Sequence, residues 1–177
     1  MSETPTMIHR QTKMSYSLLL VGILVLIFDQ LTKAFVYHYL PLIDSSPYIY
    51  PYGGIGVFRH FAGIEFSINH MTNTGAAWGV LGNYQLPLII LRIGLIVGLC
   101  IYLFYFNRHS FWQLPLILII AGALGNVFDF FIYGHVVDML HFVLWGYDFP
   151  VFNLADSAIF LGIVSLLFLS FLEDKLL

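Results

Sequence analysis

Four long apolar stretches divide the chain, and few polar residues interrupt them. A hydrocarbon core of roughly 30 Å needs about 20 helical residues, and each stretch reaches that length. The pattern predicts membrane-spanning helices over four ranges, namely 16–36, 86–106, 111–131 and 153–172. The first stretch is too long for a signal-peptide core and has no small-residue cleavage site before its polar end, so we interpret it as a retained helix.

The segments between these stretches show a different pattern. In the loop 37–85, polar and apolar residues alternate from Ile64 to Asn69, which predicts two or more short strands. Open strand edges cannot face lipid, so we expect these strands to lie on the membrane surface. The segment 132–152 must turn back into the membrane and is expected to form a hairpin at the same surface. The fold class expected is therefore a mostly α membrane protein with four transmembrane helices and a small extracytoplasmic β-sheet.

The composition supports an integral membrane protein. Of the 177 residues, 59% are hydrophobic and 10% are charged, with a mean hydropathy of +0.86, whereas soluble domains have about 25% charged residues. About half of the chain lies in the spans, so we expect residues 1–177 to form a single domain. Arg10 and Lys13 precede the first span, Arg108 lies between the second and third, and Lys175 follows the fourth. This distribution places both termini in the cytoplasm.

Several kinds of chemistry find no support in the sequence. Cys100 is the only cysteine, so the chain has no intrachain disulfide or thiolate metal cluster. The seven histidines form neither an HExxH motif nor a pair spaced four apart, which argues against a zinc protease. There is no phosphate-binding glycine loop and no basic patch, and the net charge is -3. We therefore expect no metal, no cofactor and no nucleic-acid partner.

The polar residues of the spans gather near one face of the membrane. Polar groups in a bilayer are costly unless they are paired or hydrated, so their positions are informative. Those in the spans lie toward the outer ends, and Asp138 joins them from the outer segment. The full set is Asp29, Lys33, Arg92, Asn126, Asp129, Asp138, Asn153 and Asp156.

Most of these residues have a structural interpretation. Asn153 followed three residues later by Asp156 resembles a capping box at the start of a helix. Asp29 and Lys33 have the i,i+4 spacing of an ion pair that holds a helix end.

Asn126 and Asp129 have structural interpretations as well. Asn126 suits a hydrogen bond between helices, helped by small neighbours such as Gly122 that permit close approach. Asp129 is suited to anchor the helix at the outer interface.

Asp138 is harder to explain in this way. It lies among aliphatic residues in "HVVDML", with no basic residue between Arg108 and Lys175. The hairpin geometry can bring it close to Asp156. Two carboxylates in a partly dry site cannot readily both ionise, so one holds its proton and the pair can perform acid–base hydrolysis. A proton-coupled transporter and a noncatalytic membrane adaptor remain alternatives at this point.

The order of four motifs resembles a known family. "FDQLTK", "NTGAAWG", "GALGNVFDFFIYGHVVD" and "FNLADSAIF" occur in this order across the four spans. They resemble the bacterial lipoprotein signal peptidases, also called signal peptidase II, over nearly the whole chain. The resemblance implies that the "VVD" and "FNxAD" aspartates, Asp138 and Asp156, form the catalytic dyad.

The resemblance also assigns the remaining motif residues. It implies roles in substrate binding or in support of the acids for Asn73, Gly75, Asn126, Asp129 and Asn153. Asn126 and Asn153 can donate amide hydrogen bonds to a carboxylate or to the peptide. Structural roles are implied for three further positions, which are Asp29, Lys33 and Gly122.

The function implied is that of an aspartic endopeptidase that removes signal peptides from prolipoproteins. It cuts before a cysteine that already carries diacylglycerol, at the outer leaflet of the cytoplasmic membrane. The partners implied are lipid-modified prolipoproteins, membrane lipids and globomycin-type inhibitors, and we expect the protein to act as a monomer.

One position departs from the family pattern. An arginine usually follows the acid that corresponds to Asp129, but Phe130 stands there in this chain. Arg92 is our candidate replacement for substrate binding, because an intramembrane arginine needs an anionic partner. Its alternative role is to reach the lipid headgroups.

Overall fold

The computed structural model describes residues 12–43, 49–74 and 85–176, and four helices account for most of them. The helices are α1 (Tyr16–Tyr39), α2 (Gln85–Ile101), α3 (Gln113–Tyr133) and α4 (Leu154–Leu176). A π-helical turn extends α2 through Phe106, and a 3-10 turn from Ser110 leads into α3. Each of the four is long and apolar enough to cross a membrane. The four-helix membrane fold is confirmed.

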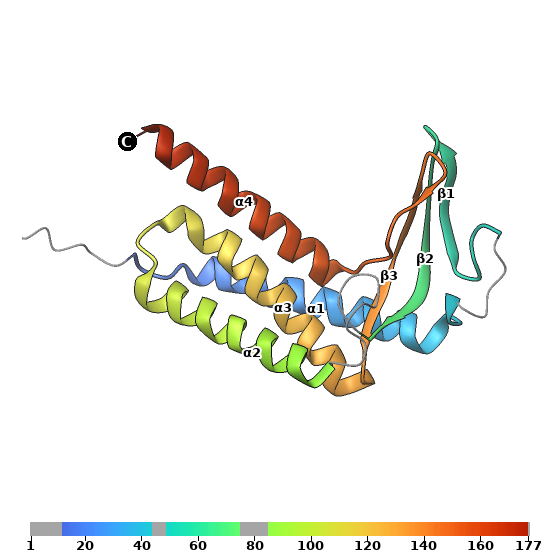
Figure 1. Ribbon diagram of the computed structural model, residues 1–177, viewed down its shortest axis with the longest axis horizontal. Coiled ribbons are helices and arrows are strands. Elements are labelled where there is room, and N and C mark those ends of the chain that lie inside the picture. The colour runs from blue at the N-terminus through green and yellow to red at the C-terminus, as the bar shows by residue number, and fades with distance from the viewer. Residues whose placement is uncertain (1–11, 44–48, 75–84, 177) are drawn as a thin grey trace, which may run out of the picture.

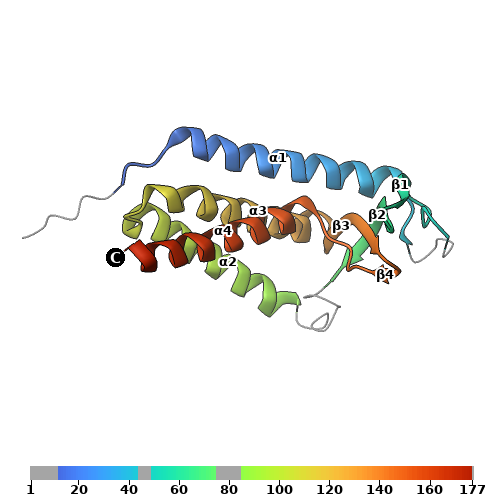
Figure 2. The ribbon, with the colours of Figure 1, turned by 90° about the horizontal axis from the view of Figure 1, so that it is seen from above.

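Helix α3 forms the centre of the bundle and packs against each of the other three. Figure 1 shows the helices side by side, with α4 leaning away from the others toward its C-terminal end. Figure 2 shows α1 and α2 on opposite sides of α3.

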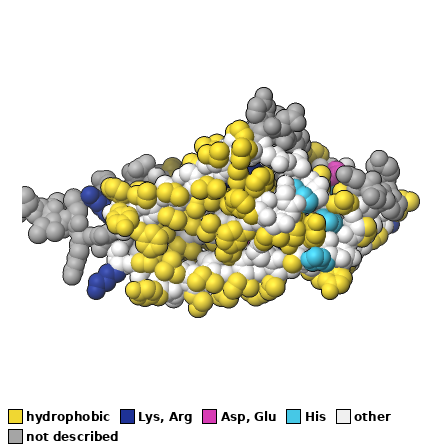
Figure 3. All heavy atoms as spheres, turned by 90° about the horizontal axis from the view of Figure 1, so that it is seen from below, with side chains coloured by type: hydrophobic (Ala, Val, Ile, Leu, Met, Phe, Trp, Pro, Cys, Tyr) yellow, Lys and Arg dark blue, Asp and Glu magenta, His cyan; other side chains and the backbone are white. Residues whose placement is uncertain are grey.

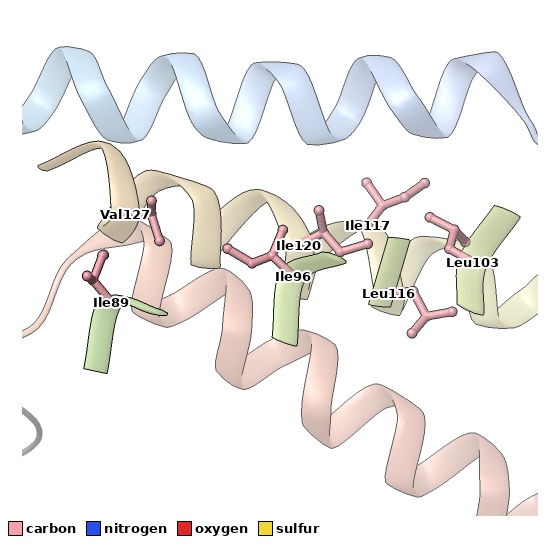
Figure 4. Close-up of a cluster of buried hydrophobic side chains, with 7 residues drawn as sticks. All are labelled: Ile89, Ile96, Leu103, Leu116, Ile117, Ile120 and Val127. Atoms are coloured by element: carbon pink, nitrogen blue, oxygen red, sulfur yellow. The ribbon is translucent and has the colours of Figure 1, made fainter. Parts of the chain in front are cut away.

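Aliphatic side chains form the seam between α2 and α3 (Figure 4). Ile89 and Ile96 of α2 and Leu103 of the π-helical turn recur at intervals of seven and pack with Leu116 and Ile120 of α3. That spacing keeps one face of each helix against the other.

A four-stranded antiparallel sheet lies across one end of the bundle (Figure 1). Its order is β1-β2-β3-β4, with β1 over Ile55–Phe61, β2 over Ile64–Asn73, β3 over Val136–Leu144 and β4 over Tyr147–Asp148. The small sheet is confirmed, and the loop supplies the two strands expected there. The outer hairpin forms β3 and β4, which join the same sheet as its third and fourth strands.

The register of β2 against β3 places the two outer segments together. Met71 pairs with Asp138 and Asn73 pairs with Val136. Gly134, in the left-handed conformation at φ 78°, ends α3 and turns the chain directly into β3. The sequence between α3 and α4 therefore carries Asp138 back over the helix ends.

Small residues allow α3 and α4 to approach closely at this end. A Cβ atom on Gly122 would lie 2.3 Å from the carbonyl oxygen of Ala155 and 2.8 Å from Ile159. Only glycine permits this contact, so the first turn of α4 lies directly against α3.

Candidate active site

A cavity of about 790 Å³ lies between the sheet and the helix ends. Six elements contribute polar side chains to its wall: β2, α2, α3, β3, β4 and α4. The predicted site residues among these side chains are Asn73, Arg92, Asn126, Asp138 and Asp156. The structure thus brings Asp138 and Asp156 to a single cavity.

Asp138 is 2% exposed and lies at the start of β3. Its Oδ1 accepts a hydrogen bond from the Asn153 amide at 2.7 Å, and its Oδ2 accepts one from Asn73 at 3.2 Å. Burial raises the pKa of Asp138 to about 7, and the charge of Asp156 acts in the same direction. The two amide hydrogen bonds and the charge of Lys33 partly offset this rise in pKa.

Asp156 lies in the first turn of α4, and the capping box expected with Asn153 is present. The Asp156 backbone N–H donates to Asn153 Oδ1 at 2.8 Å, and the Asn153 N–H donates to Asp156 Oδ2 at 3.4 Å. The other carboxylate oxygen, Oδ1, accepts a hydrogen bond from Asn126 at 2.8 Å. The Asp156 side chain therefore caps helix α4 and also faces the cavity.

A buried ionic cluster lies behind this wall. Lys33 is fully buried, and its ammonium group lies 2.8 Å from Asp29 and 2.8 Å from Asp129. It also donates to Asn126 Oδ1 at 3.0 Å. The expected i,i+4 pair is present, but it is one part of a larger network that joins α1 to α3.

The predicted residues thus separate into two layers. Asn73, Arg92 and Asn126 line the cavity, whereas Asn153 is buried behind the wall and donates a hydrogen bond to Asp138. Asp129 has no exposed surface and does not contribute to the cavity wall. Gly75 lies outside the described residues.

Arg92 lines one cavity with the acids and another with Phe130. Both residues line a second, smaller cavity together with Asn73.

Two residues that contribute to the site are not predicted from the sequence. Gln30 donates to Asp129 Oδ1 at 2.9 Å and to Asp29 Oδ2 at 3.2 Å, and so bridges the two acids. His141 lines the cavity and lies 2.7 Å from Asp148. Their signals were a polar residue next to Asp29 within a span, and a second polar residue in the strand that carries Asp138.

The predicted site residues supply carboxylates, amides and one guanidinium group, and His141 adds an imidazole. Among the residues that the structure describes, no group of three or more His, Cys, Asp or Glu side chains could hold a metal ion. A pair of carboxylates, one protonated and one ionised, can activate a water molecule and protonate a carbonyl oxygen.

Comparison with known proteins identifies the family. The sequence model described as signal peptidase (SPase) II matches residues 21–172. The chain belongs to the signal peptidase II family. Its activity is that of a peptidase that removes signal peptides from prolipoproteins.

Relatives and solved structures agree with this membership. The chain is 38% identical to a lipoprotein signal peptidase of Chlamydia pneumoniae, over 93% of this chain and 95% of that protein. It is 33% identical to one from Staphylococcus aureus, over 88% of each. A bacterial membrane enzyme solved by the in meso method at 2.3 Å resolution superposes with a TM-score of 0.78 at 30% identity, covering 93% of each chain. A second, solved at 1.9 Å, gives a TM-score of 0.71 at 29% identity, over 89% of this chain and 94% of that one.

Because the chain belongs to a peptidase family, a proton-coupled transporter is excluded as its primary function. The signal peptidase II family consists of multi-pass bacterial membrane enzymes, and four apolar helices place this chain among them.

Proposed function

We propose that Asp138 and Asp156 are the catalytic dyad of this peptidase. The observation that carries the proposal is that the two carboxyl groups line one cavity and that the charge of Asp156 acts on Asp138. The ionised aspartate takes a proton from water, and the resulting hydroxide attacks the peptide carbonyl carbon. The protonated aspartate donates its proton to the carbonyl oxygen, which gives a tetrahedral intermediate.

Asp138 holds the proton at the start of the reaction. Its pKa of about 7 keeps a large share of it protonated near neutrality. When the intermediate collapses, the C–N bond breaks and the leaving amine takes a proton from the aspartate that accepted one from water. At the same time, a hydroxyl of the intermediate returns its proton to the other aspartate as the carbonyl of the product acid forms. Each carboxyl group thus alternates between acid and base.

The neighbouring residues have supporting roles in this proposal. Asn73 and Arg92 bind the substrate from the cavity wall, and Asn126 and Asn153 hold the two carboxyl groups by hydrogen bonds. Asp129 supports the site from behind through its contact with Lys33. Gly75 is assigned to the substrate-binding loop by resemblance alone.

The substrate is a prolipoprotein cut before its diacylglyceryl-modified cysteine. The signal-peptide helix and the acyl chains can remain in hydrocarbon while the scissile bond reaches the acids at the water boundary. Globomycin-type inhibitors would occupy the same cavity, membrane lipids would surround the four helices, and the protein would act as a monomer.

Substitution of each acid by its amide tests the dyad. We expect Asp138→Asn and Asp156→Asn each to lower kcat on a lipidated prolipoprotein by about 100- to 10,000-fold, the contribution of general acid–base catalysis. Glu173→Gln is the matched control, because Glu173 pairs with His109 and lies on the last helix far from the cavity. Folding is checked by the thermal unfolding temperature. Activity retained in either aspartate variant would refute the proposal.

A further inference from the structure

Lys33 has three N–H donors, and each is directed at a different acceptor. We propose that Lys33 is a positioning residue for the dyad. Each of its three partners makes a further hydrogen bond, either with the backbone N–H of the residue before Asp138 or Asp156 or with the Asp156 side chain itself. This inference rests on the proposed function. It assigns Lys33 a role in the reaction beyond the support of helix α1.

The first partner, Asp29, leads to Asp156. Asp29 Oδ2 contacts the ammonium group, and its Oδ1 accepts the backbone N–H of Ala155 at 2.8 Å. Ala155 is fully buried and immediately precedes Asp156. The carboxylate of Asp29 therefore holds the first turn of α4 at the residue next to the acid.

The second partner, Asp129, leads to Asp138 in the same manner. Asp129 Oδ2 contacts the ammonium group and accepts the backbone N–H of Val137 at 3.2 Å. Val137 is fully buried and immediately precedes Asp138. Two buried carboxylates, joined through one cation, thus hold the chain next to each member of the dyad.

The third partner, Asn126, reaches the side chains themselves. An ammonium group can only donate, so it requires the carbonyl oxygen of the Asn126 amide to face it. The Nδ2 group must then face the other way, where it donates to Asp156 Oδ1 at 2.8 Å. The same Oδ1 of Asn126 accepts from Asn153 at 3.2 Å, and Asn153 donates to Asp138. Lys33 therefore fixes the orientation of the amide that contacts Asp156.

An ion pair that only held helix α1 would need Asp29 alone. The other two contacts cross from α1 to α3, and their onward hydrogen bonds end at Val137 and Asp156. All three acceptors surround an ammonium group with no exposed surface, so water cannot replace it. Loss of the cation would release both backbone anchors and the amide together.

Kinetics of Lys33→Met in the full-length protein, purified in detergent micelles, test this inference. Methionine has a similar length and no charge. With a lipidated prolipoprotein as substrate, we expect kcat to fall about 100-fold while KM stays within about threefold, as for displaced catalytic groups. Lys13→Met is the matched control, because Lys13 is exposed at the opposite end of α1, and it should retain normal kcat.

The pH profile separates positioning from general support of the fold. The charged groups that act on Asp138 are Asp156 from α4 and Lys33 from α1, and the charge of Lys33 lowers its pKa. The alkaline limb of the pH–rate profile, which belongs to Asp138, should therefore move to higher pH in Lys33→Met. Fewer folded molecules would lower the rate at every pH without moving either limb.

A double variant keeps the test decisive if Lys33→Met does not fold. Asp29→Asn/Lys33→Met removes one buried charge of each sign, and the Asn oxygen can still accept the Ala155 N–H. We expect this variant to fold and to show a similarly reduced kcat, because the contacts to Asp129 and Asn126 remain lost. Normal kcat in a folded Lys33 variant would overturn the inference. The dyad itself fails only if Asp138→Asn or Asp156→Asn remains active.

Discussion

The surroundings of Asp138 give it a different pKa from that of an ordinary surface acid. Burial opposes its ionisation, the charge of Asp156 adds to that effect, and amide donors from Asn73 and Asn153 oppose both. The balance leaves the pKa of Asp138 at about 7. A carboxyl group poised near the working pH can donate and accept a proton with similar ease.

The pH dependence of cleavage tests this balance. If Asp138 works as the acid, the rate should fall as the pH rises through about 7, because the group loses its proton there. The Asn73 hydrogen bond lowers the pKa of Asp138, so Asn73→Ala should raise it and move this alkaline limb to higher pH. The measurement is kcat against pH for both proteins. An alkaline limb that moves to lower pH in the variant would contradict the assignment.

Arg92 offers a second test at a single residue. We expect Arg92→Ala to lower kcat/KM by about 10- to 100-fold, the size of a lost charge-assisted hydrogen bond. Because Arg92 and Phe130 line the same small cavity, Phe130→Arg in that background should restore much of the activity. Arg59→Ala is the control, since Arg59 lies half-exposed on β1 and pairs with Glu65. Full activity in Arg92→Ala would remove Arg92 from the site.

Local spacing explains which site contacts could be predicted. The Asn153–Asp156 capping box and the Asp29–Lys33 pair join residues three and four positions apart, so the sequence alone indicates them. The contact of Lys33 with Asp129 spans two helices and depends on how they pack. No local pattern specifies such a contact, so Lys33 could be assigned to the fold but not connected to the acids.

At the level of elements, the helices follow from apolar length, and the sheet follows only in part. Alternation indicates the strand around Ile64 to Asn69, but the more buried face of this strand carries Ser67 and Asn69 rather than the apolar side chains. Strand β3 shows no such alternation, since its first four residues, Val136 to Met139, are all buried. Its pairing with β2 joins segments about 70 residues apart, which only the closed fold determines.

Glycine at the α3–α4 contact can be tested by adding one methyl group. A Cβ atom at Gly122 would meet backbone and side-chain atoms of α4, whereas one at Gly98 of α2 would meet nothing within 4 Å. We expect Gly122→Ala to destabilise the protein by about 1–3 kcal/mol, the usual cost of overpacking. Gly98→Ala, the matched control, should leave the thermal unfolding temperature unchanged or slightly raised. Equal unfolding temperatures for the two variants would refute the close approach.

The whole molecule has the polarity expected of a membrane protein. Apolar side chains cover the helical body in Figure 3, while the buried positions include Asp29, Lys33, Asp129 and Asp138. Apolar residues face lipid without cost, and the polar ones are satisfied by each other. The bilayer thus favours collecting every ionic group of the site at one end of the bundle.

The distribution of charge along the long axis predicts how the molecule is oriented in the membrane. Basic side chains are most prominent at one end of the surface in Figure 3, and histidines lie toward the end that carries the sheet, to which Arg59 of β1 also belongs. Cytoplasmic segments carry the excess of lysine and arginine. We therefore expect the turn between α2 and α3 to face the cytoplasm, and the sheet with its cavity to face outward.

Cysteine labelling in intact cells tests this orientation. With Cys100→Ser as background, Tyr147→Cys on β4 and Ser110→Cys in the turn before α3 replace exposed residues at opposite ends. A membrane-impermeant maleimide should label the β4 cysteine in intact cells and the turn cysteine only after lysis. Labelling of both after lysis controls for reactivity. The reverse pattern would place the dyad on the cytoplasmic side, where a signal peptide already carried across the membrane could not present its cleavage site.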